Sequence, residues 1–213
     1  MSAASSVPAQ KRDPVTGKAL VDYRAVATLA LPLMLNSSLQ AIISLTDTWF
    51  VGHISTTAMA GMAAVYWVVL LFVMLIGGIG LAVQTIVAQA EGGRRRTRAS
   101  HATWVALLAS ALTLPFFALV AWSGPWLFSP FGLAPEVQAQ AMAFWQPRML
   151  GAPIAVALWA VLGFFNGISR PGVAVMTTGL VAIINAALNW LFIFKLDGGI
   201  AGSAWATNVS MIC

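Results

Sequence analysis

Charged residues are scarce in this sequence. Only 8% of its 213 residues are Asp, Glu, Lys or Arg, whereas 60% are hydrophobic and the mean hydropathy is +0.86. A soluble domain carries about 25% charged residues, and its core could not bury this much apolar sequence. The sequence therefore predicts a polytopic membrane protein embedded in a lipid bilayer. Its net charge of +5 fits membrane topology, so we expect no nucleic-acid partner.

Cysteine and histidine are also nearly absent. The single cysteine, Cys213, is the last residue, and the two histidines, His53 and His101, lie far apart. This excludes an internal disulfide and a cysteine metal cluster, and it disfavours a zinc site. The GxSxG, HExxH and P-loop motifs are missing as well. We therefore predict no enzyme, no metal and no cofactor, and we expect any transport to be driven by an ion gradient or by a partner.

Long apolar runs predict an all-α bundle of five full transmembrane helices and a truncated sixth. A span needs about 20 apolar residues, and the last run is shorter than that. Residues 1–22 lack the apolar stretch of a signal peptide, so we expect a flexible cytoplasmic tail before a transmembrane lobe over residues 23–213. The expected helices cover residues 25–52, 57–89, 99–122, 137–168, 173–195 and 200–213.

The positive charges indicate how the chain is oriented in the membrane. Arg94–Arg98 forms the strongest charge run, and Arg170 lies two helices further on, whereas the loop at 122–135 has no charge at all. Cytoplasmic loops carry the excess of Lys and Arg. We therefore place the N-terminus and both arginine-bearing loops on the cytoplasmic side of the inner membrane.

One carboxylate stands apart from the other acids. Asp47 lies inside the first expected span, whereas the remaining acids lie in tails, loops or helix ends. Placing a charge at the centre of a span costs roughly 2.5–3.5 kcal/mol on insertion scales, so such a residue marks a functional site by default. Those remaining acids are Asp13, Asp22, Glu91, Glu136 and Asp197.

Asp47 shares a helix face with two amides. At 100° per residue, Asn36, Gln40 and Asp47 lie within about 40° of one another on a helix. Such a polar stripe should face protein or a water-filled cavity rather than lipid. The two amides either line a substrate cavity with Asp47 or only bond to neighbouring helices, and the pattern leaves both open.

Further polar side chains occur on the fifth and sixth expected helices. Asn185 and Asn189 are one turn apart, and Thr207 and Asn208 follow in the next helix. A carboxylate in a low dielectric disfavours its charged form, so Asp47 is a candidate proton carrier. Carboxylate, amide and hydroxyl oxygens would equally suit Na⁺. Arg148 is the one cation near enough to pair with Asp47, and it could instead snorkel outward.

Several segments, in this order, resemble one transporter family. They are Leu29-Ala-Leu-Pro-Leu33, Thr46-Asp-Thr-Trp-Phe-Val-Gly-His53, Val87-Ala-Gln-Ala-Glu-Gly-Gly93, Gly163-Phe-Phe-Asn-Gly-Ile-Ser-Arg-Pro171, Asn185-Ala-Ala-Leu-Asn189 and Gly198-Gly-Ile-Ala-Gly-Ser-Ala-Trp-Ala-Thr207. From about residue 24 onward, the chain resembles the N-terminal half of a MATE (multidrug and toxin extrusion) transporter, closest to the DinF-like branch.

The resemblance implies an antiporter in which two six-helix lobes enclose a central cavity. Members exchange organic cations and amphipathic compounds for H⁺ or Na⁺. Carried over by position, Asp47 would be the ion-coupling carboxylate, and Asn185, Asn189 and Thr207 its polar partners. We therefore expect a small organic molecule as substrate and a C-terminal lobe as the missing partner.

The sequence departs from the family pattern in three ways. Asn189 stands where some relatives carry an acid, which weakens the Na⁺ hypothesis, and Asn166 stands where an Arg is common. No second lobe follows, which is expected of a gene fragment, a split protein or an incomplete record. The alternatives to an antiporter lobe are a flippase for lipid-linked precursors, from the related superfamily, and a non-functional membrane remnant.

Overall fold

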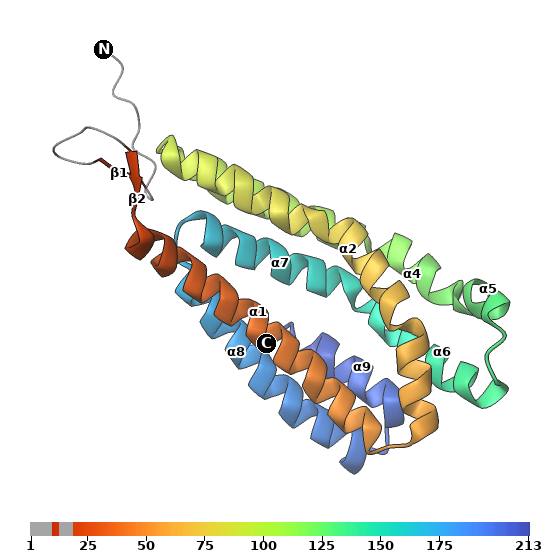
Figure 1. The fold of residues 1–213 in the computed structure, drawn as a ribbon. Coiled ribbons are helices and arrows are strands. Elements are labelled where there is room, and N and C mark those ends of the chain that lie inside the picture. The colour runs from red at the N-terminus through yellow and green to blue at the C-terminus, as the bar shows by residue number, and fades with distance from the viewer. Residues whose placement is uncertain (1–9, 13–18) are drawn as a thin grey trace.

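The computed structural model describes residues 10–12 and 19–213, and nearly all of these residues are helical (Figure 1). The helices are α1 Tyr23–Gly52, α2 Thr56–Gly92, α3 Arg96–Leu112, α4 Leu114–Trp122, α5 Gly124–Phe128, α6 Pro135–Leu150, α7 Ala152–Gly167, α8 Pro171–Trp190 and α9 Gly199–Ser210. A 3₁₀ turn, Ser129–Phe131, follows α5, and a π-helical turn, Leu191–Lys195, extends α8.

The helices confirm the expected all-α membrane bundle. Four stretches are long and apolar enough to cross a bilayer, and the α6–α7 pair, bent by 47° at Gly151, makes a fifth if it counts as one span. The helix α9 has 12 residues, which is shorter than a span. The four stretches are Val26–Gly52, Thr56–Gly92, Arg96–Trp122 and Pro171–Lys195.

Proline divides the region that we expected to be one helix and one loop. The helix expected over 99–122 is broken at Thr113 into α3 and α4, and the expected loop at 122–135 contains α5 and the 3₁₀ turn. Pro115 and Pro125 are the second residues of α4 and α5. Proline is favoured there, because the backbone N–H that it lacks would have no partner within the helix.

The expected tail lies mostly outside the described residues, which exclude 1–9 and 13–18. Its six described residues up to Val21 form two short strands, β1 Gln10–Arg12 and β2 Ala19–Val21. These pair antiparallel, with Gln10 opposite Val21. This small ladder ends just before α1, at the end of the bundle where α2 also ends (Figure 1).

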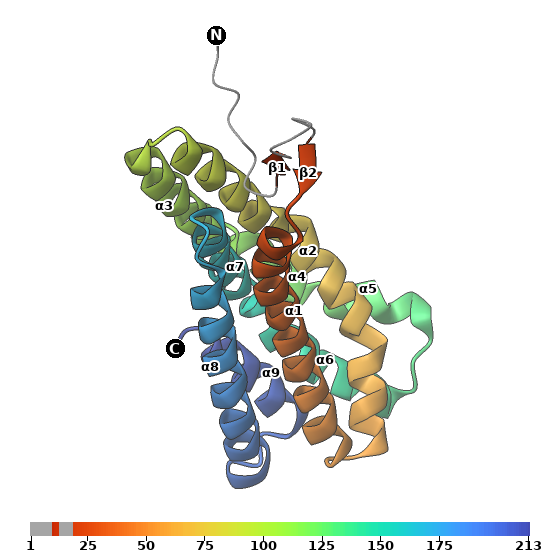
Figure 2. The ribbon, with the colours of Figure 1, turned by 60° about the vertical axis from the view of Figure 1, so that its left-hand side comes forward.

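The helices form two groups that face each other. The helix α1 packs mainly along α8, and α9 packs on α8 and α6. The long helix α2 packs on α7, α6 and α3, and has few contacts with α1 apart from their shared turn. Figures 1 and 2 show α1 and α8 side by side, and Figure 1 shows α2 and α7 on the opposite flank.

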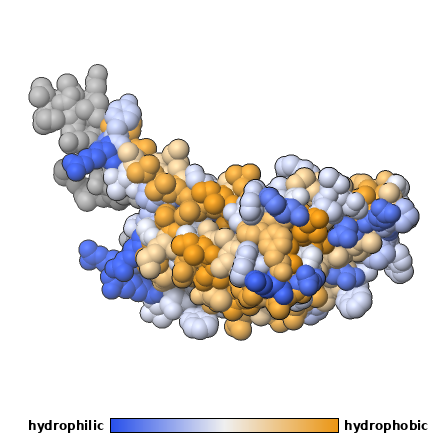
Figure 3. Space-filling model, turned by 90° about the horizontal axis from the view of Figure 1, so that it is seen from below, coloured by the Kyte–Doolittle hydropathy of each residue, from blue (hydrophilic) through white to orange (hydrophobic). Residues whose placement is uncertain are grey.

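The surface has the character of a lipid-facing protein. Large apolar side chains lie exposed along α2, among them Trp67 at 72%, Leu71 at 60% and Leu75 at 68%. On the face seen in Figure 3, hydrophobic residues cover much of the middle, and a hydrophilic group lies at the left end. Exposing such an apolar surface to water costs free energy, whereas exposing it to the hydrocarbon of a bilayer does not.

Small residues allow α2 and α7 to approach closely. A Cβ on Gly163 of α7 would lie 2.5 Å from the carbonyl oxygen of Gly80 on α2, and a Cβ on Gly80 would lie 3.0 Å from the Trp159 carbonyl oxygen. A Cβ on Gly77 would collide with the Trp159 ring. Glycine at these positions therefore fixes the distance between the two helices and the position of Trp159.

This packing predicts opposite effects for two Gly→Ala substitutions. Gly163→Ala forces two backbones apart and should lower the free energy of unfolding by about 1–3 kcal/mol. Gly78 faces open space, so Gly78→Ala should raise it by about 0.5–1 kcal/mol through helix propensity. SDS titration in mixed micelles measures both values. Equal effects of the two substitutions would contradict close packing at Gly163.

Candidate functional site

Asp47, on α1, accepts hydrogen bonds from two other helices. Its Oδ1 accepts from Nδ2 of Asn185 at 3.0 Å and from Nδ2 of Asn189 at 2.7 Å, both on α8. Its Oδ2 accepts from Oγ1 of Thr207 on α9 at 2.9 Å. The structure thus brings together the carboxylate and the three partners that the sequence suggested.

The local sequence of α8 explains where its two amides lie. The buried residues of α8 recur at helical spacing and form one stripe: Ala174, Thr178, Val181, Asn185 and Asn189. This stripe faces α1 and α9, and both asparagines are fully buried. A polar pair one turn apart is stable there only because each amide finds partners across the interface.

The start of α9 is rich in small residues, which brings Thr207 close to Asp47. A Cβ on Gly202 would lie 2.9 Å from the Phe192 carbonyl oxygen, so glycine permits α9 to fold back against the end of α8. Ser203 and Ala204 are fully buried, and Thr207 is 4% exposed. The hydroxyl of Thr207 therefore reaches Asp47 from a short, tightly packed helix.

The hydrogen-bond network suits an ionised carboxylate and leaves two oxygens unused. Three donors converge on Asp47, and a charged carboxylate is an acceptor only. Asn189 also donates to the backbone oxygen of Asn185 at 3.1 Å. Oδ1 of Asn189 and Oγ of Ser203 are buried and have no hydrogen-bond partner among the described residues.

The same network can accommodate a protonated Asp47. Oγ1 of Thr207 lies 3.1 Å from the Ser203 carbonyl oxygen, so its hydroxyl proton can turn from Asp47 to Ser203. The Asp47 O–H could then donate to the Thr207 oxygen over the same 2.9 Å. Both protonation states of Asp47 thus have a satisfied arrangement with little movement of heavy atoms.

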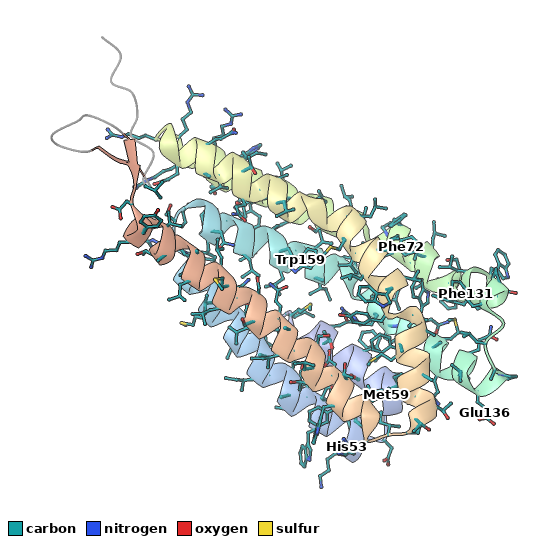
Figure 4. The ribbon with its side chains drawn as sticks, viewed as in Figure 1. His53, Met59, Phe72, Phe131, Glu136 and Trp159 are labelled. Atoms are coloured by element: carbon teal, nitrogen blue, oxygen red, sulfur yellow. The ribbon has the colours of Figure 1, made fainter. Side chains whose placement is uncertain are left out.

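A cavity of about 190 Å³ lies beside Asp47, between the two groups of helices. Trp159 points from α7 into the space between α2 and α1 (Figure 4). The lining residues are Gln40, Ile43, Ser44, Asp47, Thr48, Met62, Tyr66, Val69, Leu70, Val73, Phe144, Arg148, Ala155, Trp159, Thr207 and Met211.

The two amides predicted on the Asp47 stripe lie in different places. Gln40 lines the cavity with Asp47. Asn36 does not, because its Oδ1 accepts a hydrogen bond from Oγ1 of Thr178 on α8 at 2.6 Å. Asn36 thus links α1 to α8 about three helical turns from Asp47.

Tyr66 and Arg148 line the cavity but were not among the predicted site residues. Tyr66 of α2 places its hydroxyl 3.3 Å from Oγ of Ser44 on α1, across the gap between the two helix groups. For Arg148 of α6, the sequence left undecided whether the side chain snorkels outward or has an internal partner. It turns inward and donates from Nη1 to Oδ1 of Asn208 at 3.0 Å. The sequence feature that could have identified Arg148 as a site residue is its charge within an expected membrane span, as for Asp47.

The fold and the site define a multi-pass helical membrane protein with one carboxylate held between three helices at the wall of a cavity. Comparison with known proteins then gives the family. The MatE family model matches residues 32–191, three quarters of the chain. The chain belongs to this family of multidrug and toxin extrusion proteins. Its DinF-like branch stays a prediction.

The relatives are longer than this chain. It is 29% identical over 202 residues to the probable multidrug resistance protein NorM of Chromobacterium violaceum, covering 89% of this chain and 42% of that protein. It is 30% identical over 210 residues to the NorM of Mesorhizobium japonicum, with the same coverage. It is 27% identical to the multidrug resistance protein MdtK of Yersinia pestis, covering 85% of this chain and 40% of that protein. The chain thus spans less than half the length of these relatives.

Solved structures share the fold. A MOP superfamily transporter from Pyrococcus furiosus superposes with a TM-score of 0.78 at 24% identity, over 88% of this chain and 42% of that one. An outward-facing multidrug resistance MATE family transporter superposes with a TM-score of 0.80 at 23% identity, over the same shares. Both are named as transporters, not as enzymes.

The hydrogen bond from Thr207 predicts a measurable loss of stability. Thr207→Val keeps the shape of the side chain but removes the donor to Asp47, which should lower the free energy of unfolding by about 1–3 kcal/mol. Thr85→Val is the matched control, because the exposed Thr85 hydroxyl bonds only to Leu81 of its own helix. SDS titration compares the two. An equal loss in both variants would mean that the Asp47 contact adds nothing.

Proposed function

We propose that this chain forms the N-terminal lobe of an antiporter that exports organic cationic or amphipathic compounds in exchange for an ion. The supporting observation is Asp47, a carboxylate within a membrane span that is held by three donors and opens on a cavity. A carboxylate within a membrane span costs free energy unless it has a binding partner. The partners that a carboxylate binds are cations and protons. The names of the relatives and solved neighbours favour multidrug export.

H⁺ is the coupling ion that the site favours. Asp47 is the single carboxylate among the described residues that line the cavity, and position 189 holds an amide. One carboxylate is sufficient to carry a proton, and the Thr207 hydroxyl supports both protonation states.

Na⁺ is the second candidate, because the site also offers neutral oxygens. Oδ1 of Asn189, whose Nδ2 donates to Asp47, and Oγ of Ser203, one turn before Thr207, are buried and have no hydrogen-bond partner among the described residues. A hard cation prefers oxygen ligands of this kind. The two candidates differ in which gradient drives exchange, and the experiment below separates them.

We further propose that the protein lies in the inner membrane with its N-terminus in the cytoplasm. The start of α1, the α2–α3 turn with Arg94–Arg98 and the α7–α8 turn with Arg170 lie at one end of the bundle (Figure 1). The opposite end carries the turn before α2 and the turn before α9, where Lys195 and Asp197 offset each other. This asymmetry supports the orientation.

The function predicts the effect of Asp47→Asn. The protein is expressed from its complete reading frame in a host without related exporters, and everted vesicles are energised by a H⁺ or a Na⁺ gradient. Addition of an organic cation such as ethidium should dissipate the H⁺ gradient, which a pH-sensitive dye reports. In Asp47→Asn this response should fall to that of vesicles without the protein, because the amide binds no proton.

Asp197→Asn is the matched control. Asp197 lies in an exposed turn with φ 49°, a conformation that Asn tolerates well, so this variant should exchange normally. The other titratable or charged groups at the cavity are Tyr66 and Arg148, and both remain in each variant. Exchange that persists with its pH dependence in Asp47→Asn would refute the assignment. A wild-type response to the Na⁺ gradient alone would favour Na⁺, and no response to either would favour a remnant.

A further inference from the structure

The α2–α3 turn holds an arginine where the backbone favours glycine. The N–H of Arg95 donates to the Ala90 carbonyl oxygen at 2.7 Å, and the N–H of Arg94 donates to that of Glu91 at 2.9 Å. These two bonds define a Schellman motif, in which the left-handed residue is usually glycine. Here it is Arg94, with φ 55°, although Gly93 lies one residue earlier. The turn therefore keeps an arginine at a position that costs it conformational energy.

The α7–α8 turn has the same backbone conformation and carries an arginine at the equivalent position. The N–H of Arg170 donates to the Phe165 carbonyl oxygen at 2.9 Å, and the N–H of Ser169 donates to that of Asn166 at 3.1 Å. Ser169 is the left-handed residue, with φ 59°. Arg170 thus corresponds to Arg95, because each follows a left-handed residue and directly precedes a helix.

Packing beneath the turns brings them to one surface. Ala90 of α2 and Ala99 of α3 belong to one apolar cluster, and Ile168 of α7 packs against it. Figures 1 and 2 show the α2–α3 and α7–α8 turns at the same end of the bundle. We call the exposed cations of these two turns the arginine surface. It consists of Arg94, Arg95, Arg96, Arg98 and Arg170.

No protein anion neutralises the arginine surface within the described part of the chain. Its five side chains are exposed, and among the described residues none of them has a hydrogen-bond or ion-pair partner. Glu91, the acid of the α2–α3 turn, is half-buried and likewise makes no ion pair with a described residue. Like charges this close repel one another, so a bound anion would stabilise the two turns.

The arginine surface lies where a bilayer has its headgroups. Apolar exposure begins one turn after Arg170, with Val173 on α8 at 37%. On α3, Trp104 is 65% exposed and lies six residues after Arg98, about 9 Å along the helix. Tryptophan is enriched at the boundary between lipid and water. The anions that a membrane offers at this depth are lipid phosphates.

We propose that the arginine surface binds the headgroups of anionic phospholipids in preference to zwitterionic ones. A guanidinium pairs with a phosphate through two parallel hydrogen bonds. A zwitterionic headgroup brings its own cation, which five arginines repel. In the orientation proposed above, the bound lipids belong to the cytoplasmic leaflet. Binding of this kind goes beyond the proposed transport function and does not require it.

The test compares two lipids with the same acyl chains, dioleoyl phosphatidylglycerol and dioleoyl phosphatidylcholine. The protein, expressed from its complete reading frame, is purified in a non-ionic detergent, and native mass spectrometry gives the affinity of the first bound lipid. The wild type should bind phosphatidylglycerol more tightly. Arg95→Gln and Arg170→Gln should each weaken that binding about fivefold, because each removes one cation near the headgroup. Neither should weaken phosphatidylcholine binding.

Arg94→Gly separates lipid binding from stability. Glycine adopts φ 55° without strain, so this variant should unfold at a higher SDS fraction than the wild type. Its affinity for phosphatidylglycerol should nevertheless fall about fivefold. An arginine that served only the fold would give the variant an unchanged lipid affinity, and that result would contradict the proposal. Asp47→Asn should retain the preference for phosphatidylglycerol, so this test is independent of the ion-coupling test.

Lys195→Gln is the matched control, because it removes one positive charge from the opposite end of the bundle. There Lys195 lies over the Trp190 ring, 5.3 Å from its centroid. The first phosphatidylglycerol should bind this variant as it binds the wild type. Equal weakening in Lys195→Gln and Arg95→Gln, or equal wild-type affinities for the two lipids, would overturn the proposal. A single-stranded oligonucleotide that bound through the same arginines, in the absence of lipid preference, would assign the surface to nucleic acid instead.

Discussion

The need to satisfy one carboxylate inside a membrane span determines how this bundle is arranged. Asp47 costs roughly 2.5–3.5 kcal/mol to place there, and a hydrogen bond to a charged group returns about 1.5–3 kcal/mol. Two such bonds offset the cost, and Asp47 has three, from α8 and α9. The faces of α1, α8 and α9 that carry these groups must therefore meet. Gly202 allows α9 to pack closely against the end of α8, and the buried stripe of α8 places its two asparagines toward Asp47.

The helix α9 connects the two charged groups of the cavity through neighbouring residues. Thr207 donates to Asp47, and the next residue, Asn208, accepts from Arg148. Successive residues on a helix point about 100° apart, so one turn of α9 reaches α1 on one side and α6 on the other. Asn208 also touches the break at Gly151, where α6 and α7 bend by 47°. A shift of α9 would therefore change the surroundings of both charges at once.

Periodicity and charge scarcity predicted more of the fold than of the site. Apolar runs located the spans, and the rarity of charge singled out Asp47, because both signals are local. Helical phase put Asn36, Gln40 and Asp47 on one face of α1, but it does not tell which neighbouring group each residue meets along the length of the helix. Asn36 therefore proved to bond to Thr178 instead of joining Asp47. The partner of Arg148 lies 60 residues away on a helix that the sequence could not orient. Such contacts depend on tertiary packing, which periodicity does not contain.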